Sequence, residues 1–186
     1  MHKISWVFGY GSLMWDPGFQ PVETVKAHLT GYSRSFCLIS THYRGTETQP
    51  GLVLGLDEEP AARCSGLAMR IHEPDHVEVM AYLHAREMVT EAYREEVVTL
   101  HLDDGRAVEA LTYVMRRDHE QYAGHLDAAE QARIIATAEG GRGPNAEYLF
   151  NTARHLAEIG LADAGLDHLS DEVRRLIDAG RRSQGD

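Results

Sequence analysis

The sequence predicts a single-domain protein of mixed α and β structure. Short apolar runs bounded by turn residues fill the first half, which is typical of strands, and helical periodicity dominates the last third. The 186 residues are 43% hydrophobic and 25% charged, as in ordinary soluble globular domains. We therefore expect one domain over residues 1–180, followed by a polar tail at residues 181–186.

The expected strands of the first half are short and almost continuously apolar. Such runs indicate strands that are buried on both faces or that form a closed barrel. The runs are residues 6–9, 32–40, 52–56 and 66–71. Further on, alternating apolar residues at 98–102 and 108–114 flank Asp104-Gly105, which predicts a β-hairpin.

Helical periodicity begins after Pro74. Val77, Met80, Ala81 and His84 recur at the spacing of one helical face, and this helix should end near Arg86-Glu87.

Three more helices are expected in the last third. Asp127 and Glu130 resemble a capping box that opens a helix reaching about Glu139. Pro144 suits the first turn of the next helix, and Ser170 can cap a final short one.

The formal net charge of −11 argues against nucleic acids and anionic membranes as partners. No run approaches the roughly 20 apolar residues that cross a bilayer, and residues 1–10 lack the apolar core of a signal peptide. Cys37 and Cys64 suit buried packing positions better than a disulfide framework, so we expect a cytoplasmic protein. The oligomeric state has no signature in the sequence.

The stretch VFGYGSLMWDP at residues 7–17 is the first candidate for chemistry. It lacks the third glycine and the immediate helix of a dinucleotide-binding fingerprint. Glycines and successive backbone N–H groups can still form an anion-binding loop, and a tight turn explains them equally well.

Other patterns favour neither a metal site nor a serine nucleophile. His72 and His76 are separated by Pro74, which makes a helical ligand face improbable, and no Gly-x-Ser-x-Gly motif is present. Glu87 falls at a predicted helix-to-strand junction, where side chains often point into a cleft. Pairing with Arg86 or Arg94 at the surface is the competing interpretation.

Several segments in the same order resemble the γ-glutamylcyclotransferase superfamily, and more narrowly its ChaC-type, glutathione-specific branch. The resemblance extends over about residues 6–160 and rests on the ordered set rather than on any single motif. The segments that carry it are residues 6–15, 32–36, 41–46, 50–51, 82–83, 86–87, 93–94, 143–145 and 147–149.

The resemblance implies a small mixed β-barrel flanked by helices, and conversion of glutathione to 5-oxoproline and cysteinylglycine without a metal or organic cofactor. By motif position, Glu87 matches the catalytic glutamate of the family. The residues that match substrate-binding positions are Tyr10, Gly11, Ser12 and Leu13 of the loop, together with Arg44 and Tyr148. Two alternatives stay open: other γ-glutamyl amines or dipeptides as substrates, and a binding or regulatory protein without turnover.

The chemistry of ring closure explains this set of residues. The loop would fold the substrate, Glu87 would move a proton, and Arg34, Arg44 or Arg142 would supply a positive rim. Glu91 departs from the family pattern, because a small residue, often glycine, is expected there. Its carboxylate either alters the proton affinity of Glu87 or faces solvent.

Overall fold

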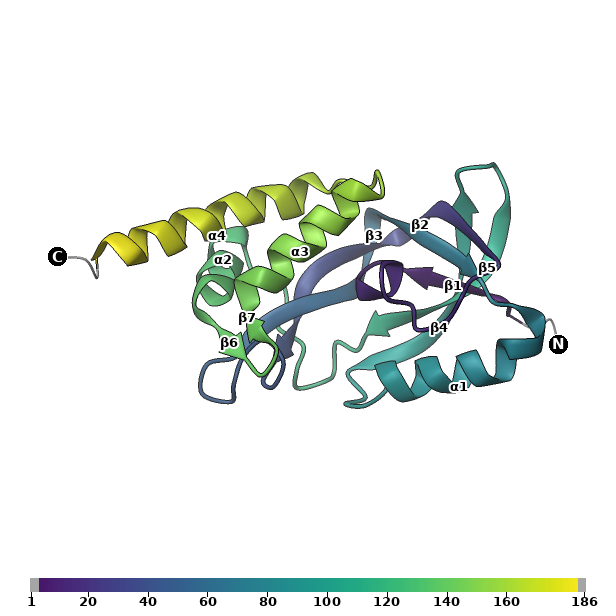
Figure 1. Ribbon diagram of the computed structural model, residues 1–186, viewed down its shortest axis with the longest axis horizontal. Coiled ribbons are helices and arrows are strands. Elements are labelled where there is room, and N and C mark those ends of the chain that lie inside the picture. The colour runs from purple at the N-terminus through teal and green to yellow at the C-terminus, as the bar shows by residue number, and fades with distance from the viewer. Residues whose placement is uncertain (1–3, 184–186) are drawn as a thin grey trace. The chain divides into compact units, whose positions relative to one another are not determined.

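The computed structural model describes residues 4–183, and the chain folds into two compact units (Figure 1). Within the described residues, the first unit comprises residues 4–35 and Gly55–Glu120, and the second comprises Phe36–Leu54 and residues 121–183. The long strands β2 and β3 contribute residues to both units. The expected single domain over residues 1–180 stays a prediction.

Five strands form a closed barrel in the order β1-β3-β2-β4-β5. Strand β1 pairs antiparallel with β3 and parallel with β5, so the barrel is mixed, as predicted. The strands are β1 (Trp6–Gly9), β2 (Glu23–Ser40), β3 (Gly51–Arg70), β4 (Tyr93–Leu102) and β5 (Ala107–Met115). Gly105, with φ +91°, lies between β4 and β5 as the Asp104-Gly105 prediction requires.

Apolar side chains from all five strands form the core of the first unit. Alternate residues of a strand point to the same side, so Val98, Leu100 and Leu102 lie on one face of β4. The buried members of this core are Trp6, Phe8, Tyr10, Ala27, Leu29, Leu56, Cys64, Ala68, Val98, Leu100, Leu102, Ala110 and Val114.

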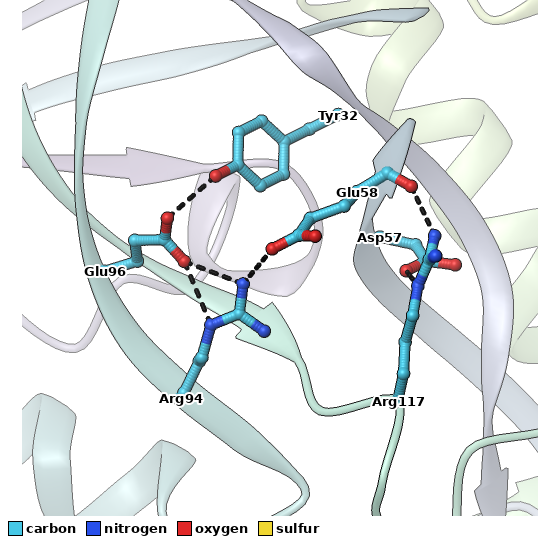
Figure 2. Close-up of polar contacts among 6 residues, drawn as sticks. All are labelled: Tyr32, Asp57, Glu58, Arg94, Glu96 and Arg117. Atoms are coloured by element: carbon cyan, nitrogen blue, oxygen red, sulfur yellow. Dashed lines mark hydrogen bonds and ion pairs between the residues drawn. The ribbon is translucent and has the colours of Figure 1, made fainter. Parts of the chain in front are cut away.

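The same face of β4 becomes polar toward its N-terminal end. There the Arg94 guanidinium lies between the carboxylates of Glu58 and Glu96, and the Tyr32 hydroxyl donates to Glu96 Oε1 at 2.9 Å (Figure 2). The pKa of Tyr32 is raised to about 12, first by burial and then by Glu96, so its phenol stays protonated. The charged groups at this end of the face are therefore paired with one another next to the apolar core.

A second ion pair lies beside this network on β3. Asp57 is only 2% exposed, and Arg117 Nε donates to its Oδ1 at 2.7 Å while the guanidinium also reaches the Glu58 carbonyl oxygen (Figure 2). A buried carboxylate needs such a partner, because desolvation otherwise costs several kcal/mol.

Helix α1 (His76–Glu87) ends where the sequence predicts, but its expected buried face is wrong. Val77 is 78% exposed, whereas Val79 and Leu83 are buried. Residues 79, 83 and 87 recur every four positions, so Glu87 continues the inward face of the helix. Two periodic faces were available, and the structure uses the one that contains fewer apolar residues.

The second unit contains three packed helices and a short two-stranded sheet. Helices α2 (Ala128–Thr137), α3 (Asn145–Glu158) and α4 (Ala164–Ser183) contact one another, and β6 (Glu139–Gly140) pairs with β7 (Gly143–Pro144). The buried side chains on these helices include Ile135, Leu149, Leu156, Leu169 and Val173.

Aspartate caps mark the starts of two helices in this unit, α2 and α4. Asp127 accepts a hydrogen bond from the Glu130 N–H at 2.8 Å, as predicted for the start of α2. The prediction that Ser170 caps a short final helix is wrong: Asp163 accepts from the N–H groups of Gly165 and Leu166, and α4 starts there. Ser170 lies inside α4, where its hydroxyl donates to the Leu166 carbonyl oxygen at 2.8 Å.

Other boundaries also differ from the sequence analysis. The runs 52–56 and 66–71 are joined in one long strand, β3, which spans Gly51–Arg70 and includes the polar residues between them. Helix α4 reaches Ser183, so it includes residues 181–183 of the predicted tail, and residues 184–186 lie outside the described part. None of the helices within residues 4–183 has the length and apolar character needed to cross a membrane.

Glu91 has a left-handed backbone, with φ +55°, which explains why a glycine is expected at this position. We predict that Glu91→Gly is more stable than Glu91→Ala by about 1 kcal/mol, because only glycine relieves the left-handed cost. Urea unfolding of the two variants measures this difference. Equal stability of the pair would mean that the backbone at residue 91 is not strained.

Candidate active site

The loop that follows β1 is a short 3-10 turn over Ser12–Met14. The Met14 N–H donates to the Gly11 carbonyl oxygen at 2.9 Å, and the Asp16 N–H donates to the Ser12 carbonyl oxygen at 2.8 Å. The N–H groups at the start of such a turn have no carbonyl partner within it, so Ser12 and Leu13 present donors of the kind that bind anions.

Glycines allow this loop to pack closely on the barrel. A methyl carbon placed on Gly66 of β3 would lie 2.2 Å from the Gly9 carbonyl oxygen, and one placed on Gly9 would lie 3.0 Å from the Met69 side chain. Backbone-to-backbone packing at the end of β1 therefore requires glycine at residue 66.

Tyr10 is fixed at both its side chain and its carbonyl group. Its phenol is buried and donates to the Tyr113 carbonyl oxygen at 2.9 Å. Arg34 Nη1 donates to the Tyr10 carbonyl oxygen at 2.8 Å and to the Ser65 carbonyl oxygen at 2.9 Å. Arg34 thus joins the loop to β3, and these bonds point its guanidinium at backbone oxygens rather than at a positive rim.

Arg86 connects the loop to Glu87. Its Nη2 donates to the Ser12 hydroxyl at 3.2 Å, its Nη1 donates to the Asp16 carbonyl oxygen at 2.6 Å, and its Nε lies 3.1 Å from Glu87 Oε1. One guanidinium therefore spans the turn, the end of α1 and the candidate carboxylate, as its five N–H donors permit.

Glu87 is a mostly buried carboxylate, with 19% of its side chain exposed. Burial raises the pKa of Glu87, while the charge of Arg86 and its hydrogen bond act in the opposite direction and lessen the rise. The competing interpretation, a surface carboxylate paired with Arg86, is correct about the pair. It is wrong about the surface, because the carboxylate is mostly buried. A raised pKa suits a group that exchanges protons near neutral pH.

The structure places the other two predicted substrate-binding residues in the second unit. Arg44 lies over the Tyr148 ring at 5.6 Å, and its Nη1 donates to the Pro144 carbonyl oxygen at 3.2 Å. The Tyr148 hydroxyl accepts from the Leu54 N–H at 3.4 Å, and the ring meets Phe36 edge-on at 6.0 Å. Arg44 and Tyr148 are thus neighbours, and their place in the site stays a prediction.

Asn145 joins the start of α3 to the start of β3 within the second unit. Its amide makes two 2.7 Å hydrogen bonds, one from the Leu52 N–H and one to the Leu52 carbonyl oxygen, which is how a neighbouring strand would pair. The side chain is fully buried and both of its polar atoms are used. Arg142, the third candidate for a positive rim, lies over the Tyr43 ring at 4.6 Å.

The structure brings the predicted loop residues 10–13 and Glu87 together in the first unit through Arg86. Sequence reasoning missed Gly66, although an isolated glycine inside a strand is itself a signal of close backbone approach. It also missed the roles of Arg34 and Arg86, whose partners are backbone and side-chain groups distant in sequence. Glu91 is exposed, so its carboxylate faces solvent.

No group of three or more histidine, cysteine, aspartate or glutamate side chains within residues 4–183 is arranged to hold a metal ion. Cys37 and Cys64 are both buried, as predicted, and they do not form a disulfide.

Comparison with known proteins identifies the family. The family model described as ChaC-like protein matches residues 5–176. The chain belongs to the ChaC-like family. A glutathione-specific gamma-glutamylcyclotransferase of Escherichia coli (strain K12) is 40% identical over 172 residues, which cover 92% of this chain and 74% of that protein. A glutathione-specific gamma-glutamylcyclotransferase of Schizosaccharomyces pombe is 32% identical, and the match covers 91% of this chain and 92% of that protein.

Solved structures agree with this assignment. The crystal structure of a yeast gamma-glutamyl cyclotransferase specific to glutathione matches with a TM-score of 0.82 and 25% identity. The match covers 92% of this chain and 96% of the yeast chain. The barrel with flanking helices is therefore the fold of a ChaC-like protein, as the sequence resemblance implies.

The close contact at Gly66 gives a first prediction for the site. We expect Gly66→Ala to lower the free energy of unfolding by about 1–3 kcal/mol, since the added methyl group must displace the Gly9 carbonyl or the Phe8 ring. Urea unfolding measures the loss. Gly180→Ala in α4 is the matched control, because no atom lies within 4 Å of the new methyl group, and its stability should not fall.

The Arg86 contact gives a second prediction. Arg86 lowers the pKa of Glu87, so Arg86→Met should raise that pKa further, whereas Arg86→Lys should raise it less because a positive charge remains. Carbon NMR titration of the Glu87 carboxyl group in the three proteins measures the order. A Glu87 pKa that is the same in wild type and Arg86→Met would contradict the contact.

Proposed function

We propose that this ChaC-like protein is a glutathione-specific γ-glutamylcyclotransferase that releases 5-oxoproline and cysteinylglycine, a lyase reaction. The observation that carries the proposal is the buried carboxylate of Glu87, joined through Arg86 to the turn at Ser12. The names of the relatives from Escherichia coli and Schizosaccharomyces pombe supply the substrate.

The reaction is an intramolecular ring closure. The α-amine of the γ-glutamyl group attacks the γ-carbonyl carbon, and the bond to the cysteine nitrogen breaks. Nucleophile and electrophile belong to one molecule, so a bound rotamer that brings them together supplies an effective concentration on the order of 10⁵ M or more. A covalent enzyme nucleophile is therefore unnecessary.

The turn at residues 10–13 would hold the γ-glutamyl group. Backbone N–H groups at Gly11, Ser12 and Leu13 suit the α-carboxylate or the oxyanion that develops on the γ-carbonyl oxygen. The contacts of Tyr10 with Arg34 and Tyr113 support this role, because they hold the turn in one conformation before the substrate arrives. One well-placed oxyanion donor is worth about 3–4 kcal/mol of barrier.

Glu87 would act as the base and then as the acid. In its ionised form it takes a proton from the α-ammonium group, which cannot attack while protonated, and it later gives a proton to the departing nitrogen. The raised pKa of Glu87 brings its proton affinity nearer to that of the groups it serves.

Arg44 and Tyr148 are also proposed to bind the substrate, because they match substrate-binding positions of the family. A guanidinium can pair with a carboxylate of glutathione, which this acidic protein otherwise repels. We also propose a cytoplasmic location, where glutathione keeps thiols reduced, in keeping with two buried cysteines outside any disulfide.

The direct test is incubation of the purified protein with glutathione and a metal chelator, followed by mass detection of 5-oxoproline. Parallel incubations with γ-glutamyl dipeptides that lack the cysteinylglycine part measure specificity. Product from glutathione alone supports the proposal. Product from the dipeptides would favour a broader cyclotransferase, and no product from any substrate would favour a binding protein of the same fold.

We predict that Glu87→Gln retains glutathione binding but lowers kcat by at least about 10²-fold, because an amide cannot exchange the proton. Steady-state kinetics and calorimetric binding separate the two effects. Glu78→Gln is the control, since Glu78 is an exposed carboxylate in the first turn of the same helix. Unchanged kcat in Glu87→Gln would remove Glu87 from the mechanism.

A further inference from the structure

The proposed ring closure has to move two protons, whereas one carboxylate holds one at a time. The α-ammonium nitrogen starts with three hydrogens and keeps one in the lactam. The departing cysteine nitrogen starts with one as an amide and ends with three as an ammonium group. Two protons therefore leave the first nitrogen and two reach the second, so either Glu87 transfers both in succession or a second group shares the transfer.

Tyr113 is a buried phenol that the proposed mechanism has not used. Its side chain lies on β5 opposite Glu95 of β4, and its hydroxyl donates to Glu95 Oε1 at 3.3 Å. The carbonyl oxygen of the same residue accepts the Tyr10 phenol, so Tyr113 also touches the turn that is proposed to hold the substrate. Tyr113 is only 1% exposed, although its hydroxyl is polar.

Glu95 extends this contact to the surface. Its Oε1 lies 3.0 Å from His84 Nδ1, and the His84 side chain is 61% exposed. His84 precedes Glu87 by three positions on α1, a spacing that makes the two residues neighbours on the helix surface. The contacts therefore run from the Tyr113 phenol, whose pKa the charge of Glu87 helps to raise, through a carboxylate to an imidazole in solvent.

Electrostatics keep the phenol able to relay a proton. Burial, then the charges of Glu95 and Glu87, raise the pKa of Tyr113, so its hydroxyl stays protonated. A neutral hydroxyl can accept one proton while it donates its own, whereas a phenolate can only accept.

We propose that Tyr113, Glu95 and His84 form a second proton route, which carries one of the two protons between the site at Glu87 and solvent. This inference rests on the proposed function. The amine lone pair forms the new bond to the γ-carbonyl carbon, and Glu87 takes one proton from the nitrogen. The second proton passes to the Tyr113 hydroxyl as that hydroxyl gives its own to Glu95, next to His84.

In the second half of the reaction, two protons are delivered to the cysteine nitrogen. The bond between the carbonyl carbon and the cysteine nitrogen breaks, and its electron pair stays on the nitrogen. Glu87 supplies the proton that makes this nitrogen a leaving amine, and the route returns the other from solvent, so every group regains its starting protonation state. In this route Tyr113 exchanges a proton with the substrate nitrogen, and Glu95 acts through Tyr113.

The test compares Tyr113→Phe and Glu95→Gln with wild type, using glutathione as substrate. We expect each variant to lower kcat roughly tenfold with KM changed less than twofold, and to enlarge the effect of D₂O on kcat. The double variant should be no slower than the slower single variant, because both changes interrupt one route. Formate should restore part of the rate to Glu95→Ala.

Tyr32→Phe is the matched control. Tyr32 donates to Glu96 Oε1 just as Tyr113 donates to Glu95, but it does so in the network around Arg94 (Figure 2). The kcat of the Tyr32→Phe variant, and the effect of D₂O on it, should equal those of wild type. Wild-type kinetics in both Tyr113→Phe and Glu95→Gln would overturn the route, as would a slower double variant with an unchanged D₂O effect. Wild type without any product would overturn the proposed function instead.

Discussion

The guanidinium of Arg86 is the contact on which the candidate site depends. Glu87 by itself is a carboxylate at the end of a helix, and residues 10–13 by themselves are a tight turn after a strand. Arg86 binds the Ser12 hydroxyl and the Asp16 carbonyl oxygen with one edge of its fork and Glu87 with its Nε. This one side chain therefore fixes the distance between turn and carboxylate, and its charge keeps the buried acid ionisable.

The barrel supplies the rigid support that this contact needs. Strand β1 lies between β3 and β5, so the turn at its end leaves a strand that is paired on both edges. Arg34 then fixes the Tyr10 carbonyl to β3, and the Tyr10 phenol fixes the other side to β5. The substrate has to bind in a bent conformation. A turn that is already rigid favours such binding, because the protein loses little conformational entropy when the substrate arrives.

Sequence reasoning reached local features and failed where distant segments decide the outcome. The end of α1, the Asp127 cap and the turn at Gly105 follow from short-range chemistry, and all three were predicted correctly. The inward face of α1 was not, because Val77 and Val79 fit helical periodicity equally well and only packing on the barrel chooses between them. The Val79 face would have pointed Glu87 inward from sequence alone. The family resemblance singled out Glu87 as a candidate, and the packing of α1 explains why its side chain points inward.

A tyrosine–glutamate hydrogen bond occurs on each face of β4, and the two bonds differ in the group that neighbours the glutamate. Tyr32 with Glu96 and Tyr113 with Glu95 are both phenols that donate to glutamates on neighbouring positions of this strand. At Glu96 the compensating group is Arg94, a permanent cation, so charge and proton stay where they are. At Glu95 the neighbouring group is His84, an imidazole that has both a donor and an acceptor nitrogen when neutral and that is 61% exposed. The first arrangement can only hold a structure together, whereas the second can also pass a proton on.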